Sequence, residues 1–203
     1  MGFDLHGLNP SNQTVPDCNY EDEEMVAAYF TWQSNTKGAY FRQNVWGWKP
    51  IWRYVMESCS DIISVEDAER GWFNDGHIID KEKAIRIAKR IRHLKNNGQL
   101  SDYAHTYKTE MDRLPDEECG ICKGTGTRKE WQGWQSEDEW LKYHDKLNTG
   151  GPGGYKWAKE CKGCNGCNGK GKQQHFDKSY PFEEEYVLEF AEFCENSGGF
   201  KIC

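Results

Sequence analysis

Nine cysteines occur along the chain, and four of them belong to two copies of one motif. Cys119 and Cys122 begin one copy of the pattern C-x-x-C-x-G-x-G, and Cys164 and Cys167 begin the other. The two-residue spacing lets both sulfurs of a pair face one ion, and the glycines allow a tight turn whose N–H groups point at the sulfurs. Cys161 also lies three positions before Cys164, but an asparagine occupies the second glycine position of that overlapping pair. The duplicated pattern therefore selects the first four cysteines as ligands of a single metal site.

The chemistry of four thiolates favours one structural Zn²⁺ ion. Two C-x-x-C pairs form the commonest closed zinc arrangement, whereas a catalytic zinc keeps one position open for water or substrate. We therefore expect the ion to contribute folding free energy and to hold the base of the insert between the two pairs. An iron–sulfur cluster is the minor alternative. Cys161 remains an alternate ligand, an exposed thiol or a spare donor beside the site.

The segment AYFRQNVWGWKPIWRYV, residues 39–55, interleaves aromatic and basic side chains. Such a mixture can stack bases and hold phosphates, but aromatic rings also build the core of a protein that has few aliphatic residues. We favour the core for most of the rings, and the alternative is a mixed arrangement with some rings inside and Arg42 or Arg53 at a cleft. The insert adds tryptophans that would suit a binding surface. The candidate ligand- or partner-binding residues are Arg42, Trp46, Trp48, Arg53, Trp131 and Trp134.

Composition limits the classes of protein to which the chain can belong. It has 203 residues and a net charge of −7, which argues against general binding to duplex nucleic acid. Its aliphatic content is low, but nine tryptophans, ten tyrosines and nine phenylalanines can fill a core. No run approaches the roughly 20 apolar residues of a membrane span, and the first ten residues lack the features of a secretory signal. We expect a cytoplasmic protein in a reducing compartment, without a membrane partner.

Hydrophobic spacing predicts a mainly helical chain. Apolar residues recur at helical intervals over residues 80–98, where Asp80 is a good N-cap and Gly98 a good C-terminal stop. The first 40 residues look irregular except for one acidic helix. Further helices are expected at 21–32, from Pro50 onward, at 64–71, 101–114, 136–147 and 181–198. The predicted fold is mainly α with a small, irregular α+β zinc-ribbon module, in one compact domain with a zinc-clamped insert. We place the aromatic-rich helical region at 1–116, the zinc module at 117–175 and a C-terminal helix that packs back at 176–203.

Other charged residues have two interpretations each. The polar face of the 80–98 helix carries six lysines and arginines, which form either a solvated face, as we favour, or a surface for an anionic partner. His77 follows a turn and is expected to cap or pack. Asp4 and His6 form an isolated D-x-H pair, which is a weak indication of a ligand site.

The cysteine motif resembles a known family feature. Its C-x-x-C-x-G-x-G repeat looks like the cysteine-rich zinc domain of J-domain co-chaperones, which carries four copies and two zinc ions. This chain has two copies, enough for one ion, and it lacks the His-Pro-Asp tripeptide of the J-domain. The resemblance therefore implies the zinc-ligand role of the four cysteines and does not imply chaperone activity.

The whole chain resembles a group of uncharacterised small proteins of bacteriophages and bacterial mobile elements. The resemblance rests on the segments MGFDLHGLNP, YFRQNVWGWKP, NDGHIIDKEKAIRIAKR and FCENSGGFKIC. It implies a phage or bacterial cytoplasmic setting and brings no established activity or catalytic residue.

Three functional hypotheses follow. The first is a non-enzymatic, zinc-stabilised binding protein, a phage-type accessory factor that engages a host protein and counters a defence or regulatory system. The alternative is a protein that binds or sequesters a nucleotide or a short single-stranded nucleic acid through the Arg/aromatic stretch. An enzyme with an unrecognised site ranks third, because no familiar catalytic motif occurs.

Overall fold

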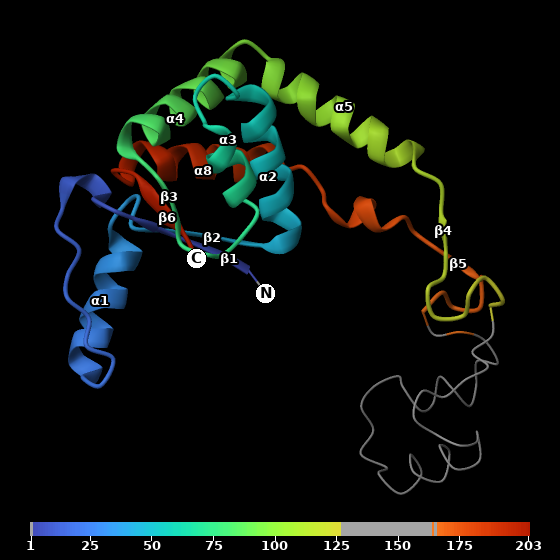
Figure 1. Ribbon diagram of the computed structural model, residues 1–203, viewed down its shortest axis with the longest axis horizontal. Helices are drawn as coiled ribbons and strands as arrows, with labels where there is room; N and C mark the ends of the chain where they lie inside the picture. The colour runs from blue at the N-terminus through green and yellow to red at the C-terminus, as the bar shows by residue number, and fades with distance from the viewer. Residues whose placement is uncertain (1, 127–163, 165) are drawn as a thin grey trace, which may run out of the picture. The chain divides into compact units, whose positions relative to one another are not determined.

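The computed structural model describes residues 2–126, 164 and 166–203, and the chain divides into two compact units (Figure 1). The core unit comprises Met1–Asp112 and Ser179–Cys203, and the cysteine unit comprises Arg113–Lys178. Each unit is described on its own below. No described helix is long and apolar enough to cross a membrane.

A four-stranded antiparallel sheet forms one layer of the core unit. Its strands are β1 (Gly2–Gly7), β2 (Tyr40–Asn44), β3 (His77–Ile79) and β6 (Phe200–Ile202), in the order β2-β1-β6-β3. The strands therefore come from distant parts of the sequence, and the two ends of the chain pair side by side. Apolar residues alternate with polar ones along β1, which turns one side of the sheet toward the helices.

Helices cover the inner side of this sheet. The layer contains α2 (Val45–Ser58), α3 (Val65–Arg70), α4 (Lys81–Asn96) and α8 (Glu184–Asn196), and α5 (Gln99–Arg113) follows α4 (Figure 1). Side chains from β1, β2, β3, β6, α2, α4 and α8 meet in one buried cluster. A separate helix, α1 (Glu23–Asn35), contributes no buried residue.

The fold class expected from the sequence is correct only in part, because the chain is mixed α+β. The sheet strands have three to six residues each. Such short strands give little periodic signal, and β1 lies within the first 40 residues, where an irregular conformation was expected. Their stability comes from pairing across the sheet, which local spacing does not reveal.

Most predicted helices occur in the structure. Asp80 caps α4 by accepting a hydrogen bond from the Lys83 N–H at 2.8 Å, and Ser64 caps α3 through a capping box. The helix expected from Pro50 onward begins five residues earlier, at Val45, because the Asn44 side chain caps it. Pro50 therefore lies inside α2 rather than in its first turn. The predicted helix at 136–147 lies outside the described residues.

Candidate metal centre and ligand-binding residues

The cysteine unit is built on a short antiparallel ribbon. Its strands are β4 (Glu117–Glu118) and β5 (Lys172–Gln173), and each leads directly into or out of one cysteine motif. A short 3₁₀ helix, residues Phe176–Ser179, follows β5. The ribbon brings the two motifs together although more than forty residues separate them in the sequence. Pairing of β4 with β5 is therefore the element that positions the candidate ligands.

The two motifs fold as near copies of each other and interlock. The Cys119 N–H donates to the Gly171 carbonyl at 2.9 Å, and the Cys164 N–H donates to the Gly126 carbonyl at 2.6 Å. Gly126 and Gly171 have φ angles of +71° and +75°. A Cβ on either of them would lie 2.4 or 2.3 Å from a carbonyl oxygen of the other motif. Only glycine fits at these positions, which is the physical reason for the second glycine of the motif.

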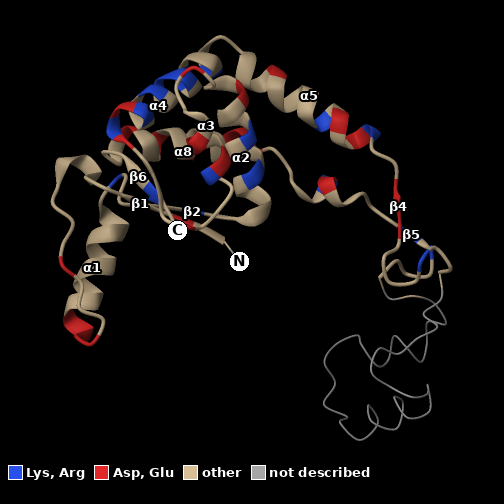
Figure 2. Cartoon of the chain, in the orientation of Figure 1, with Lys and Arg blue, Asp and Glu red and all other residues tan. Residues whose placement is uncertain are grey.

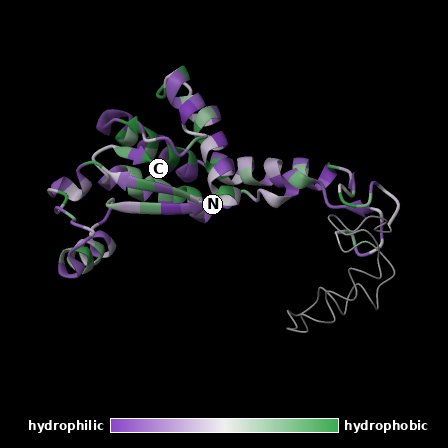
Figure 3. Ribbon diagram, turned by 60° about the horizontal axis from the view of Figure 1, so that its bottom comes forward, coloured by the Kyte–Doolittle hydropathy of each residue, from purple (hydrophilic) through white to green (hydrophobic). Residues whose placement is uncertain are grey.

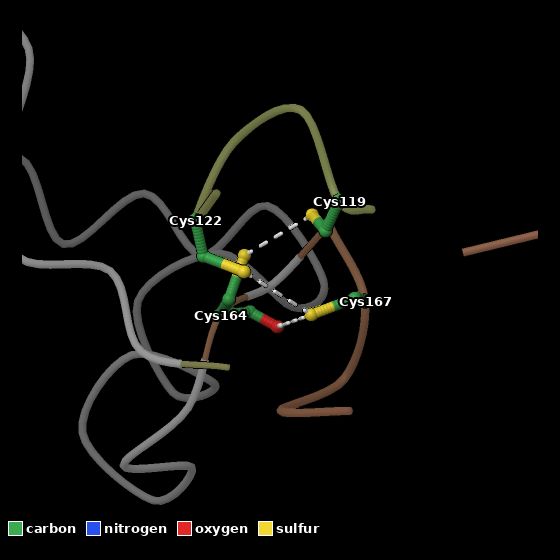
Figure 4. A group of neighbouring side chains, drawn as sticks. All are labelled: Cys119, Cys122, Cys164 and Cys167. Carbon is green, nitrogen blue, oxygen red and sulfur yellow. Dashed lines mark hydrogen bonds between the residues drawn. The ribbon is translucent and has the colours of Figure 1, made fainter. Parts of the chain in front are cut away.

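The four cysteine sulfurs form a compact, buried group (Figure 4). Cys119 Sγ lies 3.8 Å from Cys164 Sγ, and Cys122 Sγ lies 3.7 Å from Cys167 Sγ. All four sulfurs lie within 4.8 Å of one another, and none is in a disulfide, whose sulfurs would be about 2.05 Å apart. The arrangement is compatible with one metal ion at its centre.

Backbone hydrogen bonds and burial have opposite effects on the pKa values of the cysteine thiols. N–H groups of Cys122 and Ile121 help to lower the pKa of Cys119 to about 7. The Gly171 N–H donates to Cys167 Sγ at 3.1 Å, but removal from water has the larger effect and raises the pKa of that thiol to about 11. Several buried thiolates repel one another, so a central cation is needed for all four to lose their protons.

Three sequence candidates lie outside the described residues. They are Cys161, Trp131 and Trp134. The four-cysteine group is complete without Cys161, which stays an open candidate for an alternate ligand.

The aromatic stretch divides between core and surface. Trp48 is fully buried, stacks on Trp52 with ring centroids 5.5 Å apart, and donates its indole N–H to the Gly71 carbonyl at 2.9 Å. Gly71 must lack a side chain because a Cβ there would lie 2.0 Å from the Trp52 ring. Trp48 is therefore a core residue and cannot contact a ligand from solvent, which corrects its place among the binding candidates.

Trp46 and Arg53 lie on the outside of α2. Trp46 is 38% exposed and packs on Tyr180 with ring centroids 4.7 Å apart. The Arg53 guanidinium donates to Glu57 at 2.8 Å and lies over the Tyr107 ring at 5.7 Å. Both side chains are accessible, but the positive charge of Arg53 is paired within its own helix.

Arg42 belongs to a polar cluster on the open side of the sheet. Asp4 accepts a hydrogen bond from the Tyr40 hydroxyl and lies 3.5 Å from the Arg42 guanidinium. The His6 ring lies beside the Tyr40 ring at 5.3 Å, and Lys201 occupies the partner position of His6 on β6. Burial and the Asp4 hydrogen bond raise the pKa of Tyr40 to about 12, and burial lowers the pKa of His6. The sequence indicated this cluster only through its D-x-H pair, because cross-strand pairing assembles the rest.

The basic side of α4 is largely compensated. Ion pairs join Arg90 to Asp61 at 2.9 Å, Arg92 to Glu195 at 3.2 Å and Lys95 to Glu184 at 2.8 Å. This observation supports the solvated face that the sequence favoured over a surface for an anionic partner.

A buried carboxylate links α3, β3 and α4. Asp67 is 3% exposed and accepts hydrogen bonds from His77 Nε2 at 2.9 Å, from Lys83 Nζ at 2.6 Å and from the Ser64 N–H at 2.8 Å. His77 thus has a structural role beside a buried carboxylate, as expected from the sequence, which predicted that it caps or packs. No sequence motif marked Asp67 as a central residue.

Comparison of the chain with family models, with curated proteins and with solved structures gives no match.

Proposed function

We propose that the chain is a non-enzymatic binding protein stabilised by one structural zinc ion. The observation that carries this proposal is the closed set of four thiolates, Cys119, Cys122, Cys164 and Cys167. A tetrahedral ion held by four protein sulfurs has no position left for water or substrate, so the ion supplies folding free energy rather than chemistry.

The sulfur separations support zinc as the ion. A tetrahedral Zn–S distance of about 2.3 Å requires sulfurs about 3.8 Å apart. Two of the sulfur pairs lie 3.7 and 3.8 Å apart, and all four sulfurs lie within 4.8 Å of one another. An iron–sulfur cluster places inorganic sulfide between the cysteine sulfurs and needs a larger cavity.

Metal analysis tests this part of the proposal. Elemental analysis of freshly purified protein should give one zinc per chain, and X-ray absorption should give four sulfur ligands at about 2.3 Å. Cys119→Ser should remove most of the zinc, whereas Cys18→Ser, at a half-buried cysteine outside the group, should retain it. Native protein without metal would contradict the proposal.

The partner that we propose is a host protein, bound by a phage-type accessory factor that counters a defence or regulatory system. Support comes from the resemblance to small phage and bacterial proteins, and from large apolar side chains that remain exposed, among them Tyr20 at 81% and Phe30 at 52%. Affinity purification from bacteria that express the chain should recover one defined protein. Recovery of none would contradict this function.

A nucleotide or a short single-stranded nucleic acid is the second candidate ligand. The observation that favours it is the open side of the sheet, where the His6 and Tyr40 rings lie beside Arg42 and Lys201. Aromatic rings flanked by basic groups can stack bases and contact phosphates. A nucleotide panel should then raise the melting temperature, and Arg42→Ala should abolish the increase while Arg53→Ala leaves it. No increase with any nucleotide or oligonucleotide would exclude this alternative.

A further inference from the structure

The connection between β1 and β2 is far longer than the sheet requires. The two strands are antiparallel neighbours, and the Gly7 N–H donates to the Ala39 carbonyl at 3.0 Å, where the connection starts and ends. Two to five residues are enough for such a turn. Here residues 8–39, which we name the α1 arm, leave the sheet, form α1 and return (Figures 1 and 3).

The α1 arm contributes no side chain to the main hydrophobic cluster, and its buried residues, Pro10 and Ala39, lie near its two ends. Among the described residues, the core cluster has no member between Leu5 and Phe41. The arm is attached at its root, where the Leu8 N–H donates to the Gly199 carbonyl at 2.8 Å and Lys37 pairs with Glu192 at 2.6 Å. The core is therefore expected to fold without the contacts of α1. Packing in the core does not account for the residues that α1 carries.

The arm nevertheless presents a preformed helix. Asp22 caps α1 by accepting hydrogen bonds from the N–H groups of Glu24 and Met25 at 3.0 and 3.1 Å. The Trp32 indole donates to the Gln13 side chain at 3.3 Å, which ties the helix to the segment before it. An isolated helix of 13 residues is marginal in water, so these contacts order it in advance.

One side of this helix suits an apolar pocket. Phe30 is 52% exposed, and its neighbours on the same side, Ala27 and Thr31, are small and exposed. Small residues beside a protruding ring let a partner approach closely, and buried aromatic rings supply much of the free energy of protein association.

The beginning of the helix is strongly acidic. The arm holds five acidic residues and one lysine, and four of the acidic residues are consecutive, at 21–24 (Figure 2). The described residues pair none of these five carboxylates with a basic side chain. This lack of compensation contrasts with α4, where Arg90, Arg92 and Lys95 form ion pairs, and it leaves the charge available to a partner.

We propose that the α1 arm is the docking element for a protein whose apolar pocket receives Phe30 and whose pocket rim carries lysine or arginine opposite residues 21–24. A second copy of this chain is disfavoured as the occupant, because two acidic arms would repel each other. A basic surface of this kind occurs on proteins that bind nucleic acids. The inference rests on the proposed function and specifies the chemistry of the partner.

Site-specific photo-crosslinking in the full-length chain tests the arm directly. A benzoylphenylalanine replaces Phe30 in one variant and, as a matched control, Phe73 in another, since Phe73 is similarly exposed at 59% and lies outside the arm. Irradiation of bacteria that express each variant should give one discrete adduct from position 30 and none of the same mass from position 73. The crosslinked protein is then identified by mass spectrometry and purified.

Binding of the purified partner to variants measures separately the apolar contact made by Phe30 and the electrostatic attraction of residues 21–24. Phe30→Ala should weaken binding at least about tenfold, and Phe73→Ala should leave it unchanged. The double variant E23K/E24K should also weaken binding and should reduce its dependence on salt, because it removes the attraction to the basic rim. Unchanged zinc content and circular dichroism in each variant show that the fold is retained.

The remaining outcomes separate this inference from the proposed function. A purified partner that binds wild type, Phe30→Ala and E23K/E24K equally overturns the inference and leaves the proposed function standing. An adduct of twice the mass of the chain identifies a second copy as the occupant and also overturns it. A wild-type chain that captures and crosslinks no protein contradicts both.

Discussion

Replacement of Asp67 by asparagine should cost about 3 kcal/mol of the free energy of unfolding. The carboxylate joins α3 to α4 by accepting hydrogen bonds from the Ser64 N–H and from Lys83, and it also accepts one from His77 on β3. An asparagine keeps the shape but loses the charge, and it turns an amide donor toward groups that are themselves donors. Lys83, whose side chain is 28% exposed, would lose its closest charged partner and keep only Asp80, at 3.9 Å.

The pKa of Asp67 provides the magnitude. Burial works to raise this pKa, but hydrogen bonds from Lys83, the Ser64 N–H and His77 outweigh burial and lower it to about 2 from the ordinary 3.8. A difference of nearly two units corresponds to about 2–3 kcal/mol in favour of the folded state when the group is charged. Removing one member of a buried pair costs roughly 3–5 kcal/mol, and the partial exposure of Lys83 places the expected loss at the lower end.

The sign of the pH dependence follows from the lowered pKa. Because the carboxyl is more acidic in the folded state, its contribution is fully present above the unfolded pKa and is lost as pH falls toward 2. At pH 3 the contribution of Asp67 should be roughly half of its value at pH 7. The stability difference between wild type and Asp67→Asn should therefore narrow with acidification.

Urea unfolding followed by circular dichroism, at constant zinc concentration and at pH 7 and pH 3, measures both effects. Asp75→Asn is the control, since Asp75 pairs with Arg70 at the surface and its replacement should lower the free energy of unfolding much less than Asp67→Asn does. A loss below about 1 kcal/mol for Asp67→Asn at pH 7, or a difference that does not narrow by pH 3, would refute the reasoning.

Three other perturbations test the metal centre and the core. Gly171→Ala should weaken zinc binding at least about tenfold in a chelator competition, because its Cβ would lie 2.3 Å from the Gly124 carbonyl oxygen; Gly120→Ala, with nothing within 4 Å, should bind as wild type does. Equal affinities would contradict the interlocked geometry. Trp48→Phe should lower the free energy of unfolding in urea by about 2–3 kcal/mol, because it removes a hydrogen bond and leaves a cavity. The control Trp46→Phe should lower it by less than about 0.5 kcal/mol. Equal losses would contradict the assignment of Trp48 to the core. Removal of metal by a chelator should increase hydrogen exchange in the cysteine unit and leave that of α4 and α8 unchanged, whereas unchanged exchange in the cysteine unit would mean that no ion stabilises it.

The cysteine motif shows how much of a site local spacing can reveal. One pattern occurs twice, at Cys119 and Cys122 and at Cys164 and Cys167. In both copies the turn requires glycines with positive φ, so the same residue types recur at the same spacing. What spacing could not show is how the two turns meet. The reciprocal hydrogen bonds to Gly126 and Gly171 are long-range contacts, which depend on the pairing of β4 with β5.

The aromatic stretch shows the opposite case. Trp46 and Trp48 are two positions apart and chemically identical, and yet one is 38% exposed and the other fully buried. The sequence alone could not assign them, because the strand β2 changes to the helix α2 between Asn44 and Val45, and the period of the inward-facing residues changes with it.

The sequence by itself determined the helices with a strong apolar stripe or a good cap, such as α4, and the two C-x-x-C-x-G-x-G motifs, because each of these depends on residues close together in the chain. Only the tertiary structure decided the order β2-β1-β6-β3, the polar cluster around Asp4 and the position of the α1 arm outside the core. These features depend on which distant segments pair across the sheet, and the free energy of such pairing comes from surfaces that meet only after the chain has folded.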